Sequence, residues 1–259
     1  MAIKYKYIYG PVPSWRLGRS LGVDPISMPE KTCPFNCTYC QLGESVRYET
    51  ERKVFVPTES ILTEISSLPS DVKMDYITMS GRGEPTLALN LGEIIDDIKK
   101  IRTEPVAVLT DASIIDRDDV RFDLMKADFV MAKLDAPDEE LFRKICKPAP
   151  GIEFRKILEG LKIFRKQYRG RFALQMMFVK ANKISAEKMS ELARELHPDE
   201  VQLNTPLRPC YEIPLTIEEM ALIAKLFEGM RIVTVYDGFH DKVKPISTKD
   251  ALYRRGKRI

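Results

Sequence analysis

The stretch Lys31–Gly43, KTCPFNCTYCQLG, places three cysteines in a C-x3-C-x2-C spacing, at Cys33, Cys37 and Cys40. A disulfide uses two thiols, and a closed tetrahedral zinc site uses four ligands. Three thiolates that hold a cube of four irons leave one iron without a protein ligand, and therefore open to another molecule. The other residues able to bind a metal through sulfur or imidazole lie far away in the sequence: Cys146, Cys210, His197 and His240.

The composition is that of a globular chain, with 259 residues, a mass of 29.7 kDa and 44% hydrophobic residues. This is enough for one α/β domain with a sizeable core. The start, MAIKYKYIYG, lacks the apolar segment of a signal peptide, and no run approaches the length of about 18 apolar residues that spans a membrane. We therefore expect a cytoplasmic protein, in which clustered cysteines favour metal binding or catalysis over disulfides.

The charge is unevenly distributed, although the net charge of +3 does not by itself indicate a nucleic-acid-binding protein. Residues 242–259 carry seven basic side chains and one acidic side chain, a local charge of +6, which leaves −3 on the other 241 residues. The basic residues are Lys242, Lys244, Lys249, Arg254, Arg255, Lys257 and Arg258. We therefore divide the chain into a domain, residues 1–240, which begins with a Gly/Pro-rich loop, and a basic C-terminal tail, residues 241–259.

Short β-rich runs alternate with amphipathic helical patterns, which is typical of repeated β/α units around a parallel sheet. The six predicted strands are Ser20–Pro25, Tyr76–Ser80, Val106–Asp111, Asp128–Asp135, Phe172–Val179 and Glu200–Thr205. The predicted helices are Glu59–Leu68, Leu91–Ile101, Asp116–Lys126, Ile152–Tyr168, Ala186–Leu196 and Ile217–Glu228, and a last strand is expected at Arg231–Asp237.

One face of these strands is repeatedly polar, although a parallel strand buried on both faces should be apolar on both. Polar residues share one parity within their strands at Thr78, Ser80, Lys133, Asp135, Gln175, Gln202 and Asn204. A polar face on buried strands predicts a cavity inside an open barrel, with partly solvated edge strands as the alternative.

The cysteine triplet follows the first predicted strand, so it lies at the carboxyl end of the sheet, where β/α proteins keep their active sites. A C-x3-C-x2-C motif in this position resembles the radical S-adenosylmethionine (SAM) superfamily. The resemblance implies an α/β fold, a (β/α)6 partial TIM-type barrel with mostly parallel strands. It also implies a [4Fe-4S] cluster on Cys33, Cys37 and Cys40, with the amino and carboxylate groups of SAM on the fourth iron. Reductive cleavage would then give a 5′-deoxyadenosyl radical that abstracts hydrogen from a substrate.

The motif SGRGEPTL, Ser80–Leu87, looks like the glycine-rich GGE-type motif of that superfamily. Gly81 and Gly83 allow the backbone to approach a ligand closely, and Glu84 is expected to accept a hydrogen bond from the methionine ammonium. Arg82 at the middle position departs from the family pattern, which puts the backbone role of that position in doubt.

Four further residues match cofactor-binding positions of the superfamily. Tyr39 corresponds to the aromatic residue near adenine, and Thr110 and Asp111, at the end of the third predicted strand, correspond to ribose-binding polar groups. Lys133 on the fourth predicted strand is expected to pair with the cofactor carboxylate. The alternatives are that Tyr39 packs within its loop and that Lys133 reaches solvent.

The stretch YGPVPSWRLGRSLGVDPI, Tyr9–Ile26, resembles one group within that superfamily. This group consists of small iron-sulfur oxidoreductases related to tRNA wyosine synthases. Trp15 departs from the arginine expected at its position. Arg16 and Arg19 either bind an anion near the cavity or belong to a rigid loop that packs Trp15 under the barrel.

The resemblance leaves several functions open. A substrate such as tRNA fits the wyosine branch and the basic tail, whereas a glycyl-radical-enzyme activase has similar length and one cluster. A small-molecule or peptide substrate is a further alternative, and a non-enzymatic iron-sulfur protein is disfavoured by the Gly81–Glu84 motif. The reaction implies an external electron donor such as flavodoxin or ferredoxin. Cys146 and Cys210 are expected to pack in the interior, with a role in the site as the alternative.

Overall fold

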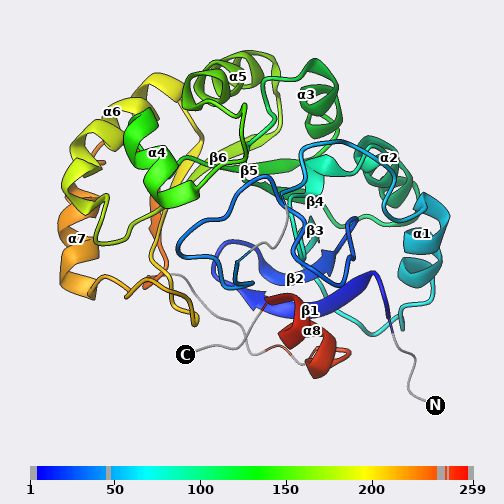
Figure 1. Ribbon diagram of the computed structural model, residues 1–259. Helices are drawn as coiled ribbons and strands as arrows, with labels where there is room; N and C mark the ends of the chain where they lie inside the picture. Colours follow the sequence, from blue (N-terminus) through cyan, green and yellow to red (C-terminus); the bar gives the residue numbers. More distant parts are fainter. Residues whose placement is uncertain (1–4, 45–47, 238–242, 244, 256–259) are drawn as a thin grey trace.

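The computed structural model describes residues 5–44, 48–237, 243 and 245–255, and shows one curled sheet surrounded by helices (Figure 1). The described sheet has eight strands in the order of the sequence, β1 to β8, and all neighbours are parallel except β1 and β2. The strands are β1 (Ile8–Ser14), β2 (Gly18–Val23), β3 (Tyr76–Met79), β4 (Val106–Thr110), β5 (Phe129–Lys133), β6 (Arg171–Met177), β7 (Glu200–Asn204) and β8 (Ile232–Thr234).

Six α-helices form an arc on the outside of the sheet: α1, α2, α3, α5, α6 and α7 (Figure 1). The described helices are α1 (Thr58–Ser66), α2 (Leu91–Ile101), α3 (Asp118–Leu124), α4 (Glu139–Cys146), α5 (Phe154–Gln167), α6 (Ala186–Leu196), α7 (Ile217–Lys225) and α8 (Thr248–Arg255), with short 3-10 turns at Pro85–Leu87 and Lys183–Ser185. None of the described helices is both long and apolar enough to cross a membrane.

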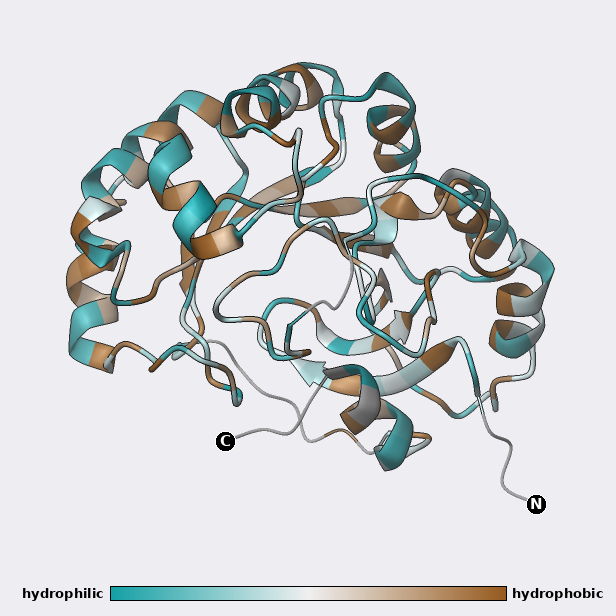
Figure 2. Cartoon of the chain, viewed as in Figure 1, coloured by the Kyte–Doolittle hydropathy of each residue, from teal (hydrophilic) through white to brown (hydrophobic). Residues whose placement is uncertain are grey.

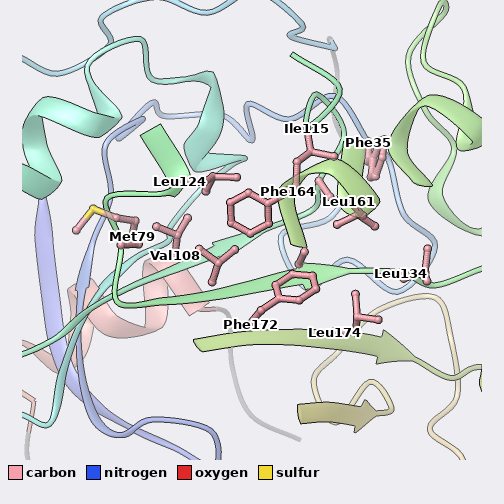
Figure 3. Close-up of a cluster of buried hydrophobic side chains, with 14 of the residues drawn as sticks. Phe35, Met79, Val108, Ile115, Leu124, Leu134, Leu161, Phe164, Phe172 and Leu174 are labelled. Atoms are coloured by element: carbon pink, nitrogen blue, oxygen red, sulfur yellow. The ribbon is translucent and has the colours of Figure 1, made fainter. Parts of the chain in front are cut away.

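The helices pack against the sheet through one apolar face each, and hydrophobic and hydrophilic residues alternate along them (Figure 2). In α2 the buried residues Leu91, Ile94, Ile95 and Ile98 recur at spacings of three and four, which places them on one side of the helix. Figure 3 shows the resulting core between α5 and the sheet, where the rings of Phe164 and Phe172 meet edge to face at 5.7 Å.

A second, smaller apolar cluster lies apart from this outer core. Its buried members are Leu17, Ala107, Phe129, Met131 and Ala173. Phe129 begins β5 and shares a face with Met131 and Lys133, so this face changes from apolar to polar along the strand. Leu17 belongs to the turn between β1 and β2, at the end of the sheet opposite the cysteine loop. The cluster therefore closes the amino-terminal end of the barrel and forms the floor of its interior.

The six predicted strands correspond to β2–β7, and the expected last strand corresponds to β8. The predicted α/β architecture with mostly parallel strands is confirmed, whereas the count of six β/α units is not, because the described sheet has eight strands. The predicted Gly/Pro loop contains β1, which includes Pro11 and Pro13. Proline cannot donate a ladder hydrogen bond, but β1 is an edge strand, where one side needs no donors.

Helix α8 lies within the segment predicted as a basic tail, and it packs on β1. Arg254 is buried on this helix, and its Nε lies 3.5 Å from Oδ2 of Asp24, which is buried after β2. The Arg254 guanidinium also donates to the carbonyl of Lys6 and lies 5.6 Å from the ring centroid of Tyr9. Arg254 therefore packs as part of the barrel. The division of the chain at residue 240 stays a prediction.

The floor of the barrel gives a first prediction. Phe129→Ala should lower the free energy of unfolding by about 3–5 kcal/mol, because Phe129 is 1% exposed and its loss leaves a cavity. Phe122→Ala is the matched control, since Phe122 is 61% exposed, and it should change stability by no more than about 0.5 kcal/mol. Chemical denaturation measures both, and equal losses for the two variants would contradict this account of the floor.

The buried ion pair gives a second prediction. Arg254→Met should cost about 3 kcal/mol, because it leaves the Asp24 carboxylate buried without its cationic partner. Arg155→Met is the control, since its pair with Glu159 is exposed on α5 and should contribute about 0.5 kcal/mol or less. Urea unfolding at neutral pH compares the two variants.

The loss of unfolding free energy in Arg254→Met should also depend on pH. Burial already raises the pKa of Asp24 above 3.8, and Arg254 is among the groups that lower it. Without Arg254 the pKa of folded Asp24 rises further, so folding increasingly favours the protonated carboxyl and stability falls as the pH rises toward that value. The deficit relative to the parent should therefore be larger at about pH 8 than at about pH 5. An equal deficit at both values would show that lost packing, not the charge of Asp24, causes it.

Candidate active site

The cysteine loop runs from the end of β2 to α1 and is held by main-chain hydrogen bonds on two sides. On one side the amide of Glu84 donates to the carbonyl of Thr32 at 3.0 Å. On the other side the amides of Asn36 and Thr38 donate to carbonyls at the end of α4, those of Cys146 at 3.0 Å and Ile145 at 2.9 Å. The last carbonyls of a helix have no partner inside the helix, so α4 offers acceptors to the loop.

Helix α4 also packs against the loop through an aromatic contact. The rings of Phe35 and Phe142 meet edge to face at 5.3 Å, and the loop pairs with the chain beyond the helix through a bridge between Phe35 and Pro148. The sequence prediction missed this helix. A signal was present, because the side chain of Asp138 caps the helix and acidic residues fill its first turn.

A cavity of about 360 Å³ occupies the inside of the barrel, between the cysteine loop and the floor. The residues predicted as cluster ligands and cofactor contacts come from four separate segments, and all ten line this cavity. They are Cys33, Tyr39, Cys37, Cys40, Gly81, Gly83, Glu84, Thr110, Asp111 and Lys133. Most residues of the predicted polar strand face line the same cavity: Thr78, Ser80, Lys133, Gln175 and Asn204. The other two, Asp135 and Gln202, are buried.

The two glycines of the Ser80–Leu87 motif lie where no side chain fits. A Cβ on Gly83 would lie 1.8 Å from the carbonyl oxygen of Thr32, and one on Gly81 would lie 2.2 Å from Cγ of Asp24. Gly83 and Thr32 form a parallel bridge, and Asp24 Oδ2 accepts from the amide of Arg82 at 3.2 Å. The glycines thus let this turn pack directly against the cysteine loop and the end of β2.

The carboxylate of Glu84 is buried and accepts four hydrogen bonds from its own chain. They come from the amide and hydroxyl of Thr86 at 3.0 and 2.7 Å, the hydroxyl of Thr110 at 2.6 Å and the amide of Asp111 at 2.6 Å. Burial, followed by the charge of Asp111, raises the pKa of Glu84 to about 8. Three of these bonds reach Oε1 and one reaches Oε2, and together they tie the turn after β3 to the end of β4. Binding of the methionine ammonium by Glu84 stays a prediction.

Lys133, Tyr39 and Asp135 form one buried polar group beside the cysteines. Nζ of Lys133 donates to the hydroxyl of Tyr39 at 2.7 Å and lies 3.3 Å from Oδ2 of Asp135, to which the Tyr39 hydroxyl also donates. Burial opposes the charge on Lys133, but Asp135 and the neighbouring thiols hold its pKa above the usual value. Lys133 therefore keeps a positive charge at the cavity wall, as its predicted role toward a carboxylate requires.

The three clustered cysteines differ in their surroundings. Sγ of Cys33 donates to Oδ2 of Asp111 at 3.2 Å, and burial and then this carboxylate raise the pKa of Cys33. A hydrogen bond from Cys146 lowers the pKa of Cys37 to about 7, with help from the charge of Lys133. Cys146 is buried beside the predicted ligand, whereas Cys210 donates to the carbonyl of Glu212 at 3.4 Å, outside the cavity lining.

The donor set that this cavity offers to a metal group consists of the three clustered thiols. In the described part of the chain no three His, Cys, Asp or Glu side chains meet closely enough to hold one metal ion. Three thiols spread over one cavity wall are nevertheless the soft ligands that iron-sulfur clusters require.

The two arginines of the first hairpin have different positions. Arg16 lines the cavity, and its guanidinium lies 4.6 Å from the ring centroid of Trp15, which lines it as well. Arg19 pairs with Asp75 through Nη2 at 2.5 Å and Nε at 3.0 Å, away from the cavity lining. The two arginines therefore do not form one site.

Comparisons with known proteins agree on one family. The family model of the radical SAM superfamily matches residues 30–197. UPF0026 protein slr1464 of Synechocystis is 42% identical, over 81% of this chain and 78% of that protein. UPF0026 protein MJ1312 of Methanocaldococcus jannaschii is 36% identical, over 84% of this chain and 69% of that protein.

Among solved structures, SuiB of Streptococcus suis bound to S-adenosylmethionine has a similar fold. Its TM-score is 0.59 at 14% identity, over 80% of this chain and 48% of that one. The matched family region begins just before the cysteine triplet and includes α4 and strands β3 to β6. The chain belongs to the radical SAM superfamily and is an enzyme of that class.

Proposed function

We propose that the enzyme binds a [4Fe-4S] cluster through Cys33, Cys37 and Cys40 and uses it to cleave SAM inside the barrel. The observation that carries this proposal is the shared cavity. The cysteine loop, the Ser80–Leu87 turn and the ends of β4 and β5 each contribute predicted residues to it. When bound, the cluster supplies the electron that splits SAM into methionine and a 5′-deoxyadenosyl radical, which abstracts hydrogen from the substrate.

Different residues around the cavity would contact different parts of the cofactor. Lys133 keeps its charge beside Asp135 and is suited to a carboxylate, as the methionine part of SAM requires. Glu84 fixes Thr110 and Asp111 at the end of β4, which presents their polar groups toward the cavity. Tyr39 is held by Lys133 and Asp135, so its ring forms a fixed wall for an aromatic base.

The reaction needs an external electron donor, and we propose a small protein such as flavodoxin or ferredoxin. The donor protein would contact the cysteine loop, because Cys40 is half-buried and the adjacent Gln41 is exposed. A donor that contacts this end of the barrel would approach the cluster without entering the cavity.

The ligand assignment gives a third prediction. Anaerobically reconstituted protein should hold about four iron and four sulfide per chain, and Cys33→Ala, Cys37→Ala or Cys40→Ala should lose the cluster and the formation of 5′-deoxyadenosine. Cys210→Ala is the matched control and should keep both, because Cys210 lies outside the cavity lining. Iron and sulfide analysis with chromatography of the products measures this. One zinc without sulfide in the parent would refute the proposal.

We propose tRNA as a candidate substrate, on the strength of the basic C-terminal segment. Among the described basic residues of this segment, Lys249 is exposed and accessible to a phosphate. Arg254 is not, because it is buried against Asp24. The tail residues Lys242, Lys244, Lys257 and Arg258 lie outside the described residues. Truncation at residue 240 would remove the buried arginine as well, so substitutions test the idea more cleanly.

The tRNA proposal gives a fourth prediction. The double substitution Lys257→Gln and Arg258→Gln should reduce the slope of log affinity for tRNA against log salt by about 1.5, since each phosphate contact contributes about 0.7 to 0.9. The control is Arg155→Gln with Lys156→Gln, two exposed basic residues on α5. Filter binding across a salt series measures both, and equal slopes for parent and tail variant would move preference to a protein or small-molecule substrate.

A further inference from the structure

A buried cysteine lies beside one of the three predicted cluster ligands. Cys37 lines the cavity, whereas Cys146, the last residue of α4, is 3% exposed and lies outside the cavity lining. The two side chains are hydrogen-bonded to each other through their sulfur atoms. The sulfur of Cys37 therefore lies between the cavity and a second thiol in the protein interior.

Main-chain contacts on both sides of Cys37 fix this arrangement. The amide of Asn36, before Cys37, donates to the carbonyl of Cys146 at 3.0 Å. The amide of Thr38, after Cys37, donates to the carbonyl of Ile145 at 2.9 Å. The two cysteines are thus neighbours because of how the loop and α4 pair, and not only because of their side-chain rotamers. We expect them to stay neighbours when the loop holds a cluster.

The chemistry of a metal ligand decides which of the two sulfurs donates. A cysteine that binds iron has lost its proton and can only accept a hydrogen bond, whereas Cys146 keeps its S–H. The hydroxyl of Tyr39 is also within hydrogen-bonding reach of Cys37, but it carries a single proton, which it donates to Asp135. Of these two neighbours, Cys146 is therefore the one able to donate to Cys37.

A hydrogen bond to a ligand sulfur changes how easily an iron-sulfur cluster is reduced. It stabilises the reduced form, which carries one more negative charge, and so raises the reduction potential. We propose that Cys146 is a positioning residue for the cluster, whose thiol donates to the sulfur of Cys37 and thereby favours reduction by the external electron donor. This rests on the proposed function, because it takes Cys37 to be a cluster ligand.

Three substitutions of Cys146 separate this role from simple packing, which is the usual role of a buried cysteine. Cys146→Ala and Cys146→Val both remove the donor, and their side chains are smaller and larger than that of cysteine. Cys146→Ser keeps a donor at the same position. Cys210→Ala is the matched control, because the Cys210 thiol donates to the carbonyl of Glu212 and lies outside the cavity lining.

The test is an anaerobic redox titration of the reconstituted enzyme without SAM, with dithionite as reductant and electron paramagnetic resonance to measure the reduced cluster. At the midpoint potential of the parent, the ratio of reduced to oxidised cluster should fall about tenfold in Cys146→Ala and Cys146→Val, the effect of losing one hydrogen bond to a charged sulfur. For a one-electron couple this is a shift of about 59 mV to more negative potential. Cys146→Ser and Cys210→Ala should stay within about threefold of the parent.

Iron and sulfide are measured on the same samples, so the possible failures can be told apart. Intact clusters with equal potentials in the parent, Cys146→Ala and Cys146→Val would overturn this inference alone. So would an equal fall in Cys146→Ser, because packing would then explain the effect. A parent without iron and sulfide would overturn the proposed function and this inference with it. If either Cys146→Ala or Cys146→Val fails to fold, the other decides, and loss of the cluster from all three Cys146 variants would assign the residue to assembly instead.

Discussion

The close approach of two backbone segments, at Thr32 and Gly83, is the constraint on which the rest of the site depends. Their bridge leaves no room for a side chain, since a Cβ on Gly83 would overlap the carbonyl oxygen of Thr32. The bridge brings the cysteine loop, which follows β2, against the turn that follows β3. Because those strands are parallel neighbours, both segments start at the same end of the sheet. The cysteines and the glycine motif thereby face one cavity, although nearly fifty residues of sequence separate them.

Buried carboxyl groups hold this arrangement in place, and each has specific partners. Glu84 joins the turn after β3 to the end of β4 through four hydrogen bonds. Asp24 accepts from the amide of Arg82 and is compensated by Arg254 from the last helix. A buried carboxylate without such partners would be costly, so these contacts favour one geometry over its alternatives. Rigidity at this end of the barrel is what binding of a cofactor in a fixed orientation requires.

The sequence predicted most features that depend on local pattern, with helix α4 as an exception, and it missed those that depend on distant contacts. Strands β2 to β7 follow from apolar runs, and the cavity lining follows from their polar alternate face together with the cysteine and glycine motifs. Strand β1 was missed because Pro11 and Pro13 are typical of loops, and only its edge position makes them acceptable. Helix α8 was missed because charge dominates its sequence, and the burial of Arg254 depends on Asp24 at the other end of the chain. The separation of Arg16 from Arg19 likewise depends on Asp75, which no local pattern connects to them.

The anchoring of the cysteine loop to α4 has a consequence for how this family can vary. The loop is held there by carbonyls of the helix backbone, so many side-chain replacements on the solvent side of α4 leave the anchor unchanged. A change in the length of the helix would disturb the anchor. One inserted or deleted residue turns all later carbonyls by about 100° around the helix axis, because an α-helix has 3.6 residues per turn. The acceptors at Ile145 and Cys146 would then face away from the loop, so relatives that retain the anchor should tolerate substitution in this helix far better than a change in its length.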